Sequence, residues 1–165
     1  MKPDEFTIDI LKILEKDSRA TLSQIAAMTG KSEDEVQKTV ALLEGQGIIR
    51  RYKTVIDWQK TRLECVNAYI DVKVAPSRGV GFDDVAERIA RFPEVHSIYL
   101  VSGELDLRII VTGKTILDVA HFVSEKLSTI DRVQSTITHF VLKCYKEDSE
   151  IFGEPSDDKR LPVVP

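Results

Sequence analysis

The stretch NAYIDVKV, residues 67–74, decides how this 165-residue chain is built. Its even-numbered residues are all apolar and its odd-numbered residues are Asn, Tyr, Asp and Lys, which is the two-residue period of a β-strand with one buried face. Before position 60 the apolar residues follow helical spacing instead. We therefore place a domain boundary near residues 58–61 (WQKT), with a helical domain before it and a strand-containing domain after it.

Five further elements follow this strand. The order strand, helix, strand, strand, helix, strand is that of a ferredoxin-like α+β fold, a βαββαβ antiparallel sheet with both helices on one face. We predict this domain over residues 61–148. After a break at 76–79, its elements are a helix over about 82–92, strands at 95–102 and 105–112 joined by a turn at Gly103 and Glu104, a helix over 116–127 and a last strand at 133–145.

One face of such a sheet has no cover from its own chain. Alternate residues of each strand lie on that face, and several of the candidates are large and apolar. Exposed apolar surface of this kind is most simply buried by a second copy, so we expect a homodimer through the sheet. The candidates, taken from either parity of the strands, are Tyr69, Tyr99, Val101, Ile110, Phe140 and Leu142.

Residues 1–60 carry three short apolar stretches at helical spacing. Three such helices followed by a basic strand have the shape of a winged helix-turn-helix, which inserts one helix into the major groove of DNA. Small three-helix cores also serve as protein-binding modules, and that alternative stays open. The elements are a helix over 7–16 capped by Thr7, a helix over 21–29 that stops at Gly30, a third helix that starts with a capping box of Ser32 and Glu35, and a strand or wing over 48–56.

Composition indicates a globular protein. With 42% hydrophobic and 30% charged residues, the chain can form a packed core. No apolar run approaches the roughly 20 residues of a membrane span and the N-terminus lacks the apolar stretch of a secretory signal, so we expect a cytoplasmic protein without membrane contact. The formal net charge of -4 argues against a generally basic nucleic-acid binder, and residues 1–60 are neutral in sum. Residues 149–165 are acidic and contain prolines, which is typical of a tail.

The sequence offers no catalytic, cofactor or metal site. His96, His121 and His139 are too scattered for a set of metal ligands, and no nucleophile–base pair or phosphate-binding glycine loop is recognisable. Cys65 and Cys144 form no metal-binding pair. They fall near the ends of the first and last strands, which are neighbours in this topology, so a redox role is a hypothesis. We expect a protein that is not an enzyme.

Two stretches of the chain resemble the Lrp/AsnC family of transcription regulators. The first runs from ILKILEKDSR (10–19) through SQIA (23–26) and GKS (30–32) to VQKTVALLEGQGII (36–49), and resembles the helix-turn-helix of the family. The second, VSGELDLRIIV (101–111), is similar to the hairpin of its ligand-sensing domain, in which a Gly is followed three residues later by an Asp. The resemblance covers the chain up to about residue 148. It implies a DNA-binding regulator whose assembly or DNA affinity responds to an amino acid or related metabolite, with dimers that assemble to tetramers or octamers.

The third helix departs from the family pattern in its charges. Thr39 stands where the family usually has Arg, and Lys31 replaces a common Leu. The carboxylates of Glu33-Asp34-Glu35 suit the positive end of the helix dipole, but they repel phosphate, although a carboxylate can accept a hydrogen bond from cytosine N4. DNA contact then depends on Lys31, Ser32, Gln37, Lys38 and Thr39 in and before the helix and on Arg50, Arg51 and Lys53 after it, unless this last cluster is a solvated strand edge.

The hairpin at residues 102–106 is the candidate effector site. The resemblance implies that this loop lies at the junction between dimers, where its backbone N–H groups hold a carboxylate and Asp106 holds an ammonium. The alternative is a hairpin turn with no binding role. The candidate residues are Ser102, Gly103, Glu104, Leu105 and Asp106, with Thr136 and Thr138 of the last strand.

Two alternatives to an effector-controlled DNA regulator stay open. The acidic start of the third helix is compatible with an effector-binding oligomeric module that has weak or no DNA binding. Sirohaem decarboxylases are similar to this family, but their His-Asn-Tyr type segment corresponds poorly to HSIY at 96–99.

Overall fold

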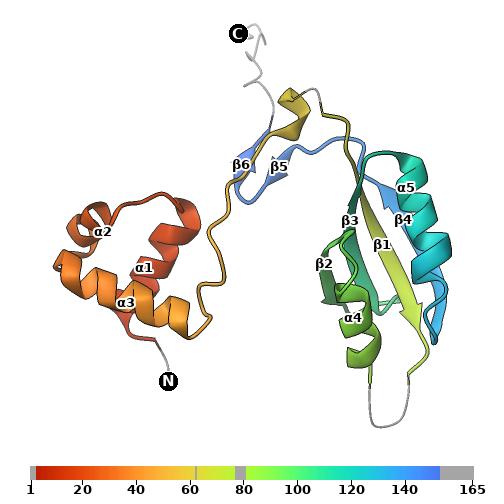
Figure 1. Cartoon of the computed structure of the whole chain (residues 1–165), viewed down its shortest axis with the longest axis horizontal. Helices are drawn as coiled ribbons and strands as arrows, with labels where there is room; N and C mark the ends of the chain where they lie inside the picture. Colours follow the sequence, from red (N-terminus) through yellow and green to blue (C-terminus); the bar gives the residue numbers. More distant parts are fainter. Residues whose placement is uncertain (1–2, 62, 77–80, 153–165) are drawn as a thin grey trace, which may run out of the picture. The chain divides into compact units, whose positions relative to one another are not determined.

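The computed structural model describes residues 3–61, 63–76 and 81–152 (Figure 1). The chain divides into two compact units, Met1–Ile56 and Asp57–Pro165. Each unit has a hydrophobic core of its own. Part of the predicted break at 76–79 and most of the predicted tail lie outside the described residues.

The first unit consists of three helices around a small core. These are α1 (Glu5–Lys16), α2 (Leu22–Thr29) and α3 (Glu33–Gly45), as the sequence predicts. The buried residues Ile10, Ile25, Ala26, Val36 and Leu43 come from all three helices, so each helix turns one apolar stripe inward.

The helix ends are fixed by local hydrogen bonds. Thr21 and Ser32 each form the predicted type of cap, in which the side chain and the residue three positions later bond reciprocally. Gly30 ends α2 in the left-handed region, at φ 67°. The prediction for Thr7 was wrong: α1 starts earlier, and the Thr7 amide donates to the capping carboxylate of Asp4 at 2.8 Å.

Residues 48–56 form no strand among the described residues of the first unit, contrary to the predicted strand or wing. The physical reason is that all described regular elements of this unit are helices, so the segment has no strand edge to pair with. Other contacts hold it instead. The Tyr52 hydroxyl donates to Glu44 of α3 at 2.7 Å, and the Ser18 hydroxyl donates to the Lys53 carbonyl at 3.1 Å.

The second unit is the predicted ferredoxin-like fold. Its antiparallel sheet has the order β2-β3-β1-β4, and α4 and α5 cover one face of it (Figure 1). The strands are β1 (Val66–Val74), β2 (Val95–Leu100), β3 (Leu107–Gly113) and β4 (Val133–Phe140), and the helices are α4 (Asp83–Ala90) and α5 (Ile116–His121). β2, α4 and β4 are shorter than predicted, β1 starts one residue before the predicted stretch, and β3 is shifted by one to two residues.

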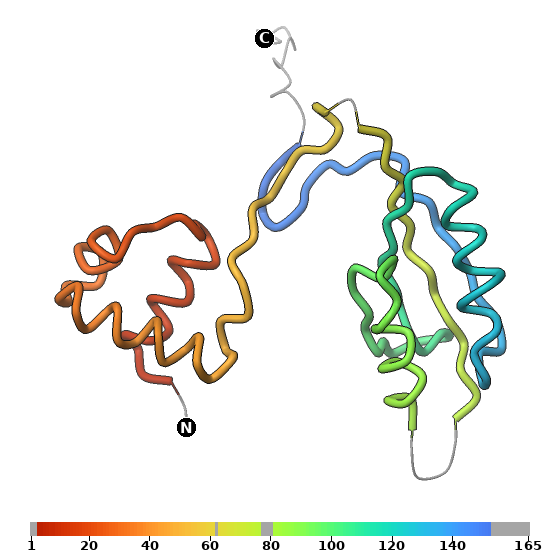
Figure 2. Tube along the Cα trace, viewed as in Figure 1, coloured from red at the N-terminus to blue at the C-terminus, as the bar shows by residue number. Residues whose placement is uncertain are grey.

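Three smaller elements complete this unit. A 3-10 turn at Trp58–Lys60 precedes β1, and α5 continues as a π-helix over Phe122–Leu127, so that the coil in Figure 2 runs without interruption to the end of the predicted helix. The predicted last strand ends at Phe140. It is followed by a two-stranded hairpin of β5 (Lys146–Glu147) and β6 (Glu150–Ile151).

The two faces of the sheet differ as the alternating pattern predicts. The helix-covered face holds the even-numbered residues of β1 with Leu107, Ile109 and Val111 of β3 in a core with α4 and α5. The open face holds Tyr69, Tyr99, Ile110 and Ile137, because the pairing register places these side chains together. Phe140, a candidate for the open face, pairs with Ala68 and therefore shares the helix-covered side.

Two features concern the residue types singled out above. Cys65 and Cys144 are both free thiols. In the described part of the chain, no group of three or more His, Cys, Asp or Glu residues is arranged to hold a metal ion.

The described helices also include none that combines the length and apolar character needed to cross a bilayer.

Candidate DNA-binding surface and effector site

Lys38 of α3 and Lys31, just before this helix, are each paired with a carboxylate of α3. Lys38 Nζ lies 2.6 Å from Asp34 Oδ2, and Lys31 Nζ lies 3.7 Å from Glu35 Oε1. All four side chains are exposed, so these are weak surface pairs of the (i, i+4) type. The positive charges of Lys31 and Lys38, two of the predicted DNA-contacting residues, are therefore partly neutralised by neighbouring carboxylates.

Two hydroxyls in the predicted DNA-binding set are also used within the helix. Ser32 Oγ bonds to the Glu35 carboxylate at 2.8 Å and accepts from the Glu35 amide at 3.3 Å. The Ser32 backbone amide also donates to Glu35 Oε2, at 3.1 Å, and this bond, followed by the one from the Ser32 hydroxyl, holds the pKa of Glu35 below its usual value. Thr39 Oγ1 donates to the Glu35 carbonyl at 2.9 Å. Gln37 is exposed, and its side chain has no hydrogen bond to any described residue.

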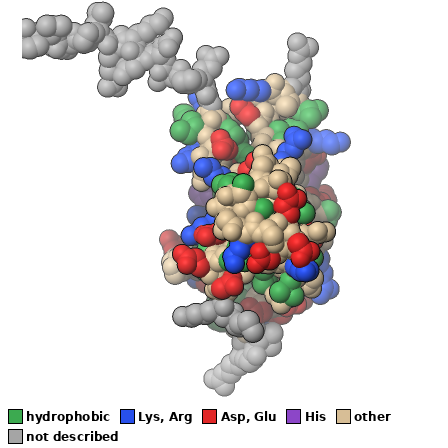
Figure 3. Space-filling view, turned by 90° about the vertical axis from the view of Figure 1, so that its left-hand side faces the viewer, with side chains coloured by type: hydrophobic (Ala, Val, Ile, Leu, Met, Phe, Trp, Pro, Cys, Tyr) green, Lys and Arg blue, Asp and Glu red, His purple; other side chains and the backbone are tan. Residues whose placement is uncertain are grey.

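The basic segment after α3 is different. Arg50 and Arg51 are exposed, and neither forms an ion pair with a described residue. Lys53 is exposed too and has an interaction of its own in this structure. Figure 3 shows basic side chains interspersed with acidic ones on the visible face of the first unit, without a continuous basic surface. Among the predicted DNA-contacting residues, Arg50 and Arg51 are therefore exposed cations without an ion pair to the described part of the chain.

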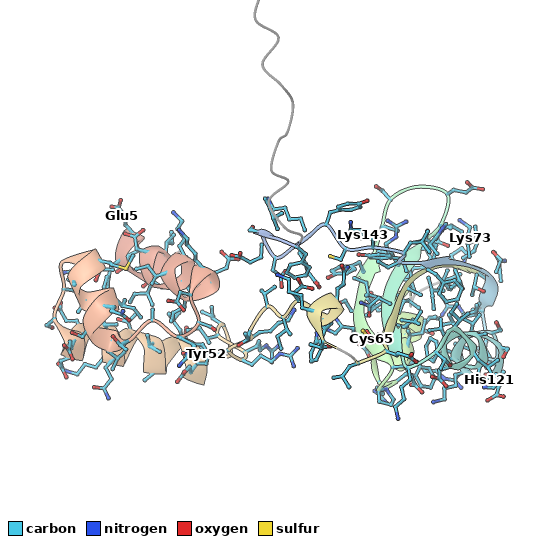
Figure 4. All side chains as sticks on the ribbon, turned by 90° about the horizontal axis from the view of Figure 1, so that it is seen from above. Glu5, Tyr52, Cys65, Lys73, His121 and Lys143 are labelled. Carbon is cyan, nitrogen blue, oxygen red and sulfur yellow. The ribbon has the colours of Figure 1, made fainter. Side chains whose placement is uncertain are left out.

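The hairpin loop between β2 and β3 is fastened to the sheet by Asp106. Its Oδ2 accepts from the Val74 amide at 2.9 Å, and its Oδ1 accepts from Lys73 Nζ at 3.3 Å. The Asp106 amide donates to the Val72 carbonyl, and Lys73 Nζ also donates to the Glu104 carbonyl, each within 3.0 Å. Lys73, labelled in Figure 4, thus fastens the loop at two points. Both carboxylate oxygens of Asp106 therefore form hydrogen bonds that hold the loop against the sheet.

A hollow of about 210 Å³ lies beside this loop. Residues 101–105 form one side of it, and Asp71 of β1 and Arg108 of β3 form the other. Arg108 donates to Asp71 through Nε at 2.7 Å and Nη2 at 2.8 Å, which is a bidentate pair. The Asp71 side chain is only 8% exposed, and the Arg108 guanidinium holds the pKa of its carboxyl below the usual value.

The structure brings five of the predicted effector residues together and separates the other two. Ser102, Gly103, Glu104 and Leu105 line the hollow, and Asp106 fastens the same loop. Thr136 and Thr138 pair with Val72 and Ile70, two core residues, so they lie on the helix-covered side of the sheet.

Asp71 and Arg108 were not singled out from the sequence. The sequence did contain an indication of them, since both are charged residues in predicted strands, where β-propensity favours uncharged residues. They lie in the two strands that the predicted topology makes neighbours, and the register places them directly opposite each other.

Two family comparisons match the two units. Residues 67–151 match the Lrp/AsnC ligand binding domain, and residues 3–50 match a winged helix-turn-helix DNA-binding domain. The fold and these matches define a transcription regulator that joins a helix-turn-helix DNA-binding segment to a ligand-binding domain. The chain belongs to the Lrp/AsnC family.

Relatives and solved structures agree with this assignment. The uncharacterized HTH-type transcriptional regulator YugG of Bacillus subtilis is 52% identical over 166 residues, with 100% of each chain covered. The crystal structure of the transcriptional regulator NMB0573/L-Met complex from Neisseria meningitidis has a TM-score of 0.70 and 26% identity, over 88% of this chain and 94% of that one. Escherichia coli AsnC has a TM-score of 0.68 at 22% identity, over 89% and 97%, and shows the shared fold.

Proposed function

We propose that this protein is a DNA-binding regulator whose assembly or DNA affinity responds to a small amino acid-like metabolite bound in the hollow beside residues 101–105. The observation that carries the proposal is the hollow itself, which lies in the ligand-binding domain and is lined by a Gly-containing loop and an anchored ion pair. The related regulator NMB0573 was crystallised with L-methionine, which supports the amino acid class. A ligand that binds one assembly state better than another shifts the population between them.

The effector proposal is tested by thermal unfolding of the full-length protein with each of the twenty L-amino acids. A ligand that binds only the folded protein raises its stability, and at 100 times its Kd the gain is about 2.7 kcal/mol. Light scattering on the same samples reports the assembly state. If no amino acid raises the midpoint, the effector class is wrong.

DNA contact is proposed to come from α3 and the segment that follows it, with Arg50 and Arg51 supplying most of the phosphate contact. The test is a salt series on duplex DNA that contains the gene's own promoter. For each phosphate contact removed, the slope of log K against log salt becomes shallower by about 0.9. The double variant Arg50→Gln/Arg51→Gln should therefore bind weakly with a shallow slope. Arg88→Gln/Arg91→Gln, an equal charge change at two exposed positions of the second unit, should leave the slope unchanged.

The same salt series also tests whether the protein binds its operator sequence-specifically. Two-fold related recognition helices meet successive major grooves about 34–36 Å apart, so we expect a pseudo-palindromic operator. Affinity for the promoter that equals affinity for random duplex at every salt concentration would remove the claim of a specific regulator.

A homodimer through the open sheet face is the proposed unit of assembly, with tetramers or octamers of dimers as the larger form. Tyr69, Tyr99, Ile110 and Ile137 give that face an apolar character, with Tyr99 53% and Ile137 49% exposed in the single chain. Asp71 and Arg108 share this face, since they pair with Ile137 and Tyr99, so in the proposed dimer the second copy borders the hollow. Ile137→Asp should lower the mass measured by light scattering. The control Ile116→Asp places the same charge on α5, where Ile116 is 59% exposed. Equal masses for the two variants would argue against the sheet face.

The charges of α3 favour a second candidate function, an effector-binding oligomeric module with weak or no DNA binding. Lys38 in α3 and Lys31 before it are both paired with carboxylates of this helix, and Glu33 adds a further carboxylate at its start. The variant Glu33→Gln/Asp34→Asn removes two negative charges there. If it binds promoter DNA where the wild type binds none, the module is the correct function.

The remaining parts of the proposal are a regulatory role without catalysis and a cytoplasmic location. The relatives compared above are transcription regulators. We propose residues 1–60 as the DNA-binding domain with its linker, 61–148 as the sensing and assembly domain and 149–165 as a tail. A purified protein that turns over sirohaem would contradict the non-enzymatic role.

A further inference from the structure

Arg108 brings a hydrogen-bond donor to the hollow. Arg108 uses Nε and Nη2 on Asp71. Among the described residues, none accepts a hydrogen bond from its Nη1, so one edge of a guanidinium that lines the hollow is available to a ligand. An anchored guanidinium with a free edge is a preorganised group for a carboxylate.

The loop adds donors of its own. The amides of Ser102, Gly103, Glu104 and Leu105 donate to no acceptor in the described part of the chain, although those of Val101 and Asp106 on either side do. Consecutive free amides attract anions, because their partial positive charges add. Residues with unbonded donors therefore line the hollow both from the loop and from β3.

Most of the carboxylates near the hollow already form hydrogen bonds or ion pairs within the protein. Asp71 is neutralised by its bidentate partner, and Asp106 has both oxygens bonded to Lys73 and Val74. Only Glu104 brings a carboxylate that makes no hydrogen bond to the described residues. The sequence assigned the ammonium of the effector to Asp106, but the bonds of Asp106 leave Glu104 as the better partner for a cation.

We infer that Arg108 is the specificity-determining residue of the effector site, and that it binds the carboxylate of the effector together with the free amides of residues 102–105. This inference rests on the proposed effector function and deepens it. The ligand class is small monocarboxylic acids: amino acids bind through the acid group first, 2-oxo acids that lack the ammonium also bind, and amino acid amides that lack the acid do not.

The test uses the full-length protein and isothermal titration. Each of the twenty L-amino acids is titrated first, followed by the 2-oxo acid and the carboxamide of the one that binds best. We expect the amino acid to bind more tightly than its 2-oxo acid, since Glu104 adds a contact to the ammonium. The carboxamide should bind at least tenfold more weakly than the amino acid. A carboxamide that binds as well as the acid overturns the inference.

Variants separate binding by Arg108 from its structural role. Arg108→Gln should weaken the acid at least tenfold, but it leaves Asp71 buried without its partner. The double variant Asp71→Asn/Arg108→Gln removes both charges, keeps hydrogen-bonding groups at both positions, and should fold yet bind as weakly as Arg108→Gln. Arg91→Gln is the matched control and should bind like the wild type.

The outcomes distinguish the two levels of the proposal. If acids bind the wild type and both Arg108 variants within threefold, the role of Arg108 is wrong while the effector function stands. If no amino acid or 2-oxo acid binds the wild type, the effector class itself is wrong, and the inference falls with it.

Discussion

Replacing Asp71 by Asn should destabilise the second unit by about 1–2 kcal/mol at pH 7. The carboxylate is 8% exposed and accepts two charge-assisted hydrogen bonds from Arg108, at 2.7 and 2.8 Å. A hydrogen bond to a charged group contributes about 1.5–3 kcal/mol. The Arg108 side chain is 49% exposed, so water recovers part of the loss, and the Asn amide oxygen can still accept one bond.

Urea denaturation at a fixed protomer concentration measures this loss. The concentration must be fixed because assembly adds to apparent stability. Arg108→Gln should cost clearly less in the Asp71→Asn background than in the wild type, since residues in direct contact are not additive. Asp83→Asn, an exposed carboxylate in the first turn of α4, is the control for loss of charge alone.

The pH dependence gives a second check on the same pair. Arg108 lowers the pKa of Asp71 in the folded protein below its ordinary value of 3.8, so the unfolded chain binds this proton first as pH falls. The stabilisation is therefore complete above the unfolded pKa and is lost as pH drops through the folded pKa. His139 Nε2 lies 3.5 Å from Asp71 Oδ2 and adds to the stabilisation when it is protonated. The difference between wild type and Asp71→Asn should therefore be at least as large at about pH 5 as at pH 8, and should shrink below about pH 4. A loss below about 0.5 kcal/mol at pH 7, or one that is as large below about pH 4 as at pH 7, would refute the assigned ion pair.

Three further variants test the fold and the loop. Ser32→Ala removes the cap of α3 and should cost the first unit about 1 kcal/mol, read as faster proteolysis of that unit, whereas an unchanged cleavage rate would contradict the cap. Gly103 has φ 138°, so Gly103→Ala should strain the loop by about 1–3 kcal/mol and weaken ligand binding in calorimetry, and unchanged binding would argue against a rigid loop. Ile89→Ala should cost about 2–5 kcal/mol in urea because Ile89 is 0% exposed, while the exposed Ile116→Ala should cost under about 0.5 kcal/mol; similar losses would contradict the assigned core.

Elements with a clear period were predictable from the sequence. The strand at Val66–Val74 alternates because one face packs against α4 and α5, and the order of the later elements then leaves few topologies. The segment 48–56 shows where a local pattern fails. Its composition favours a strand, but a strand needs a partner, and the described elements of its own unit are helices.

The site was less predictable, because it depends on register. The pairing of Asp71 with Arg108 follows from two strands meeting residue by residue, and a shift by one position would place one of them in the core. The register also places Thr136 and Thr138 on the other face of the sheet from Asp71 and Arg108, since they pair with core residues of β1. The role of Asp106 in fastening the loop required the bonds to Lys73 and Val74, which lie more than 30 positions away.

The charges of α3 weaken DNA binding by a single protomer, and this explains why an effector can control DNA binding through assembly. The pair of Lys38 with Asp34 is worth about 0.3–0.5 kcal/mol, so phosphate can draw Lys38 away at little cost, but Asp34 remains beside the phosphate and cancels much of the gain. Under the proposed function each protomer then holds DNA mainly through Arg50 and Arg51, and a single protomer binds weakly. Linking several weak binding units raises their combined affinity by factors of about 100–10,000 without any new contact. Occupancy of the operator therefore depends steeply on how many protomers are joined, and a metabolite that changes the assembly changes occupancy without touching the DNA-binding unit.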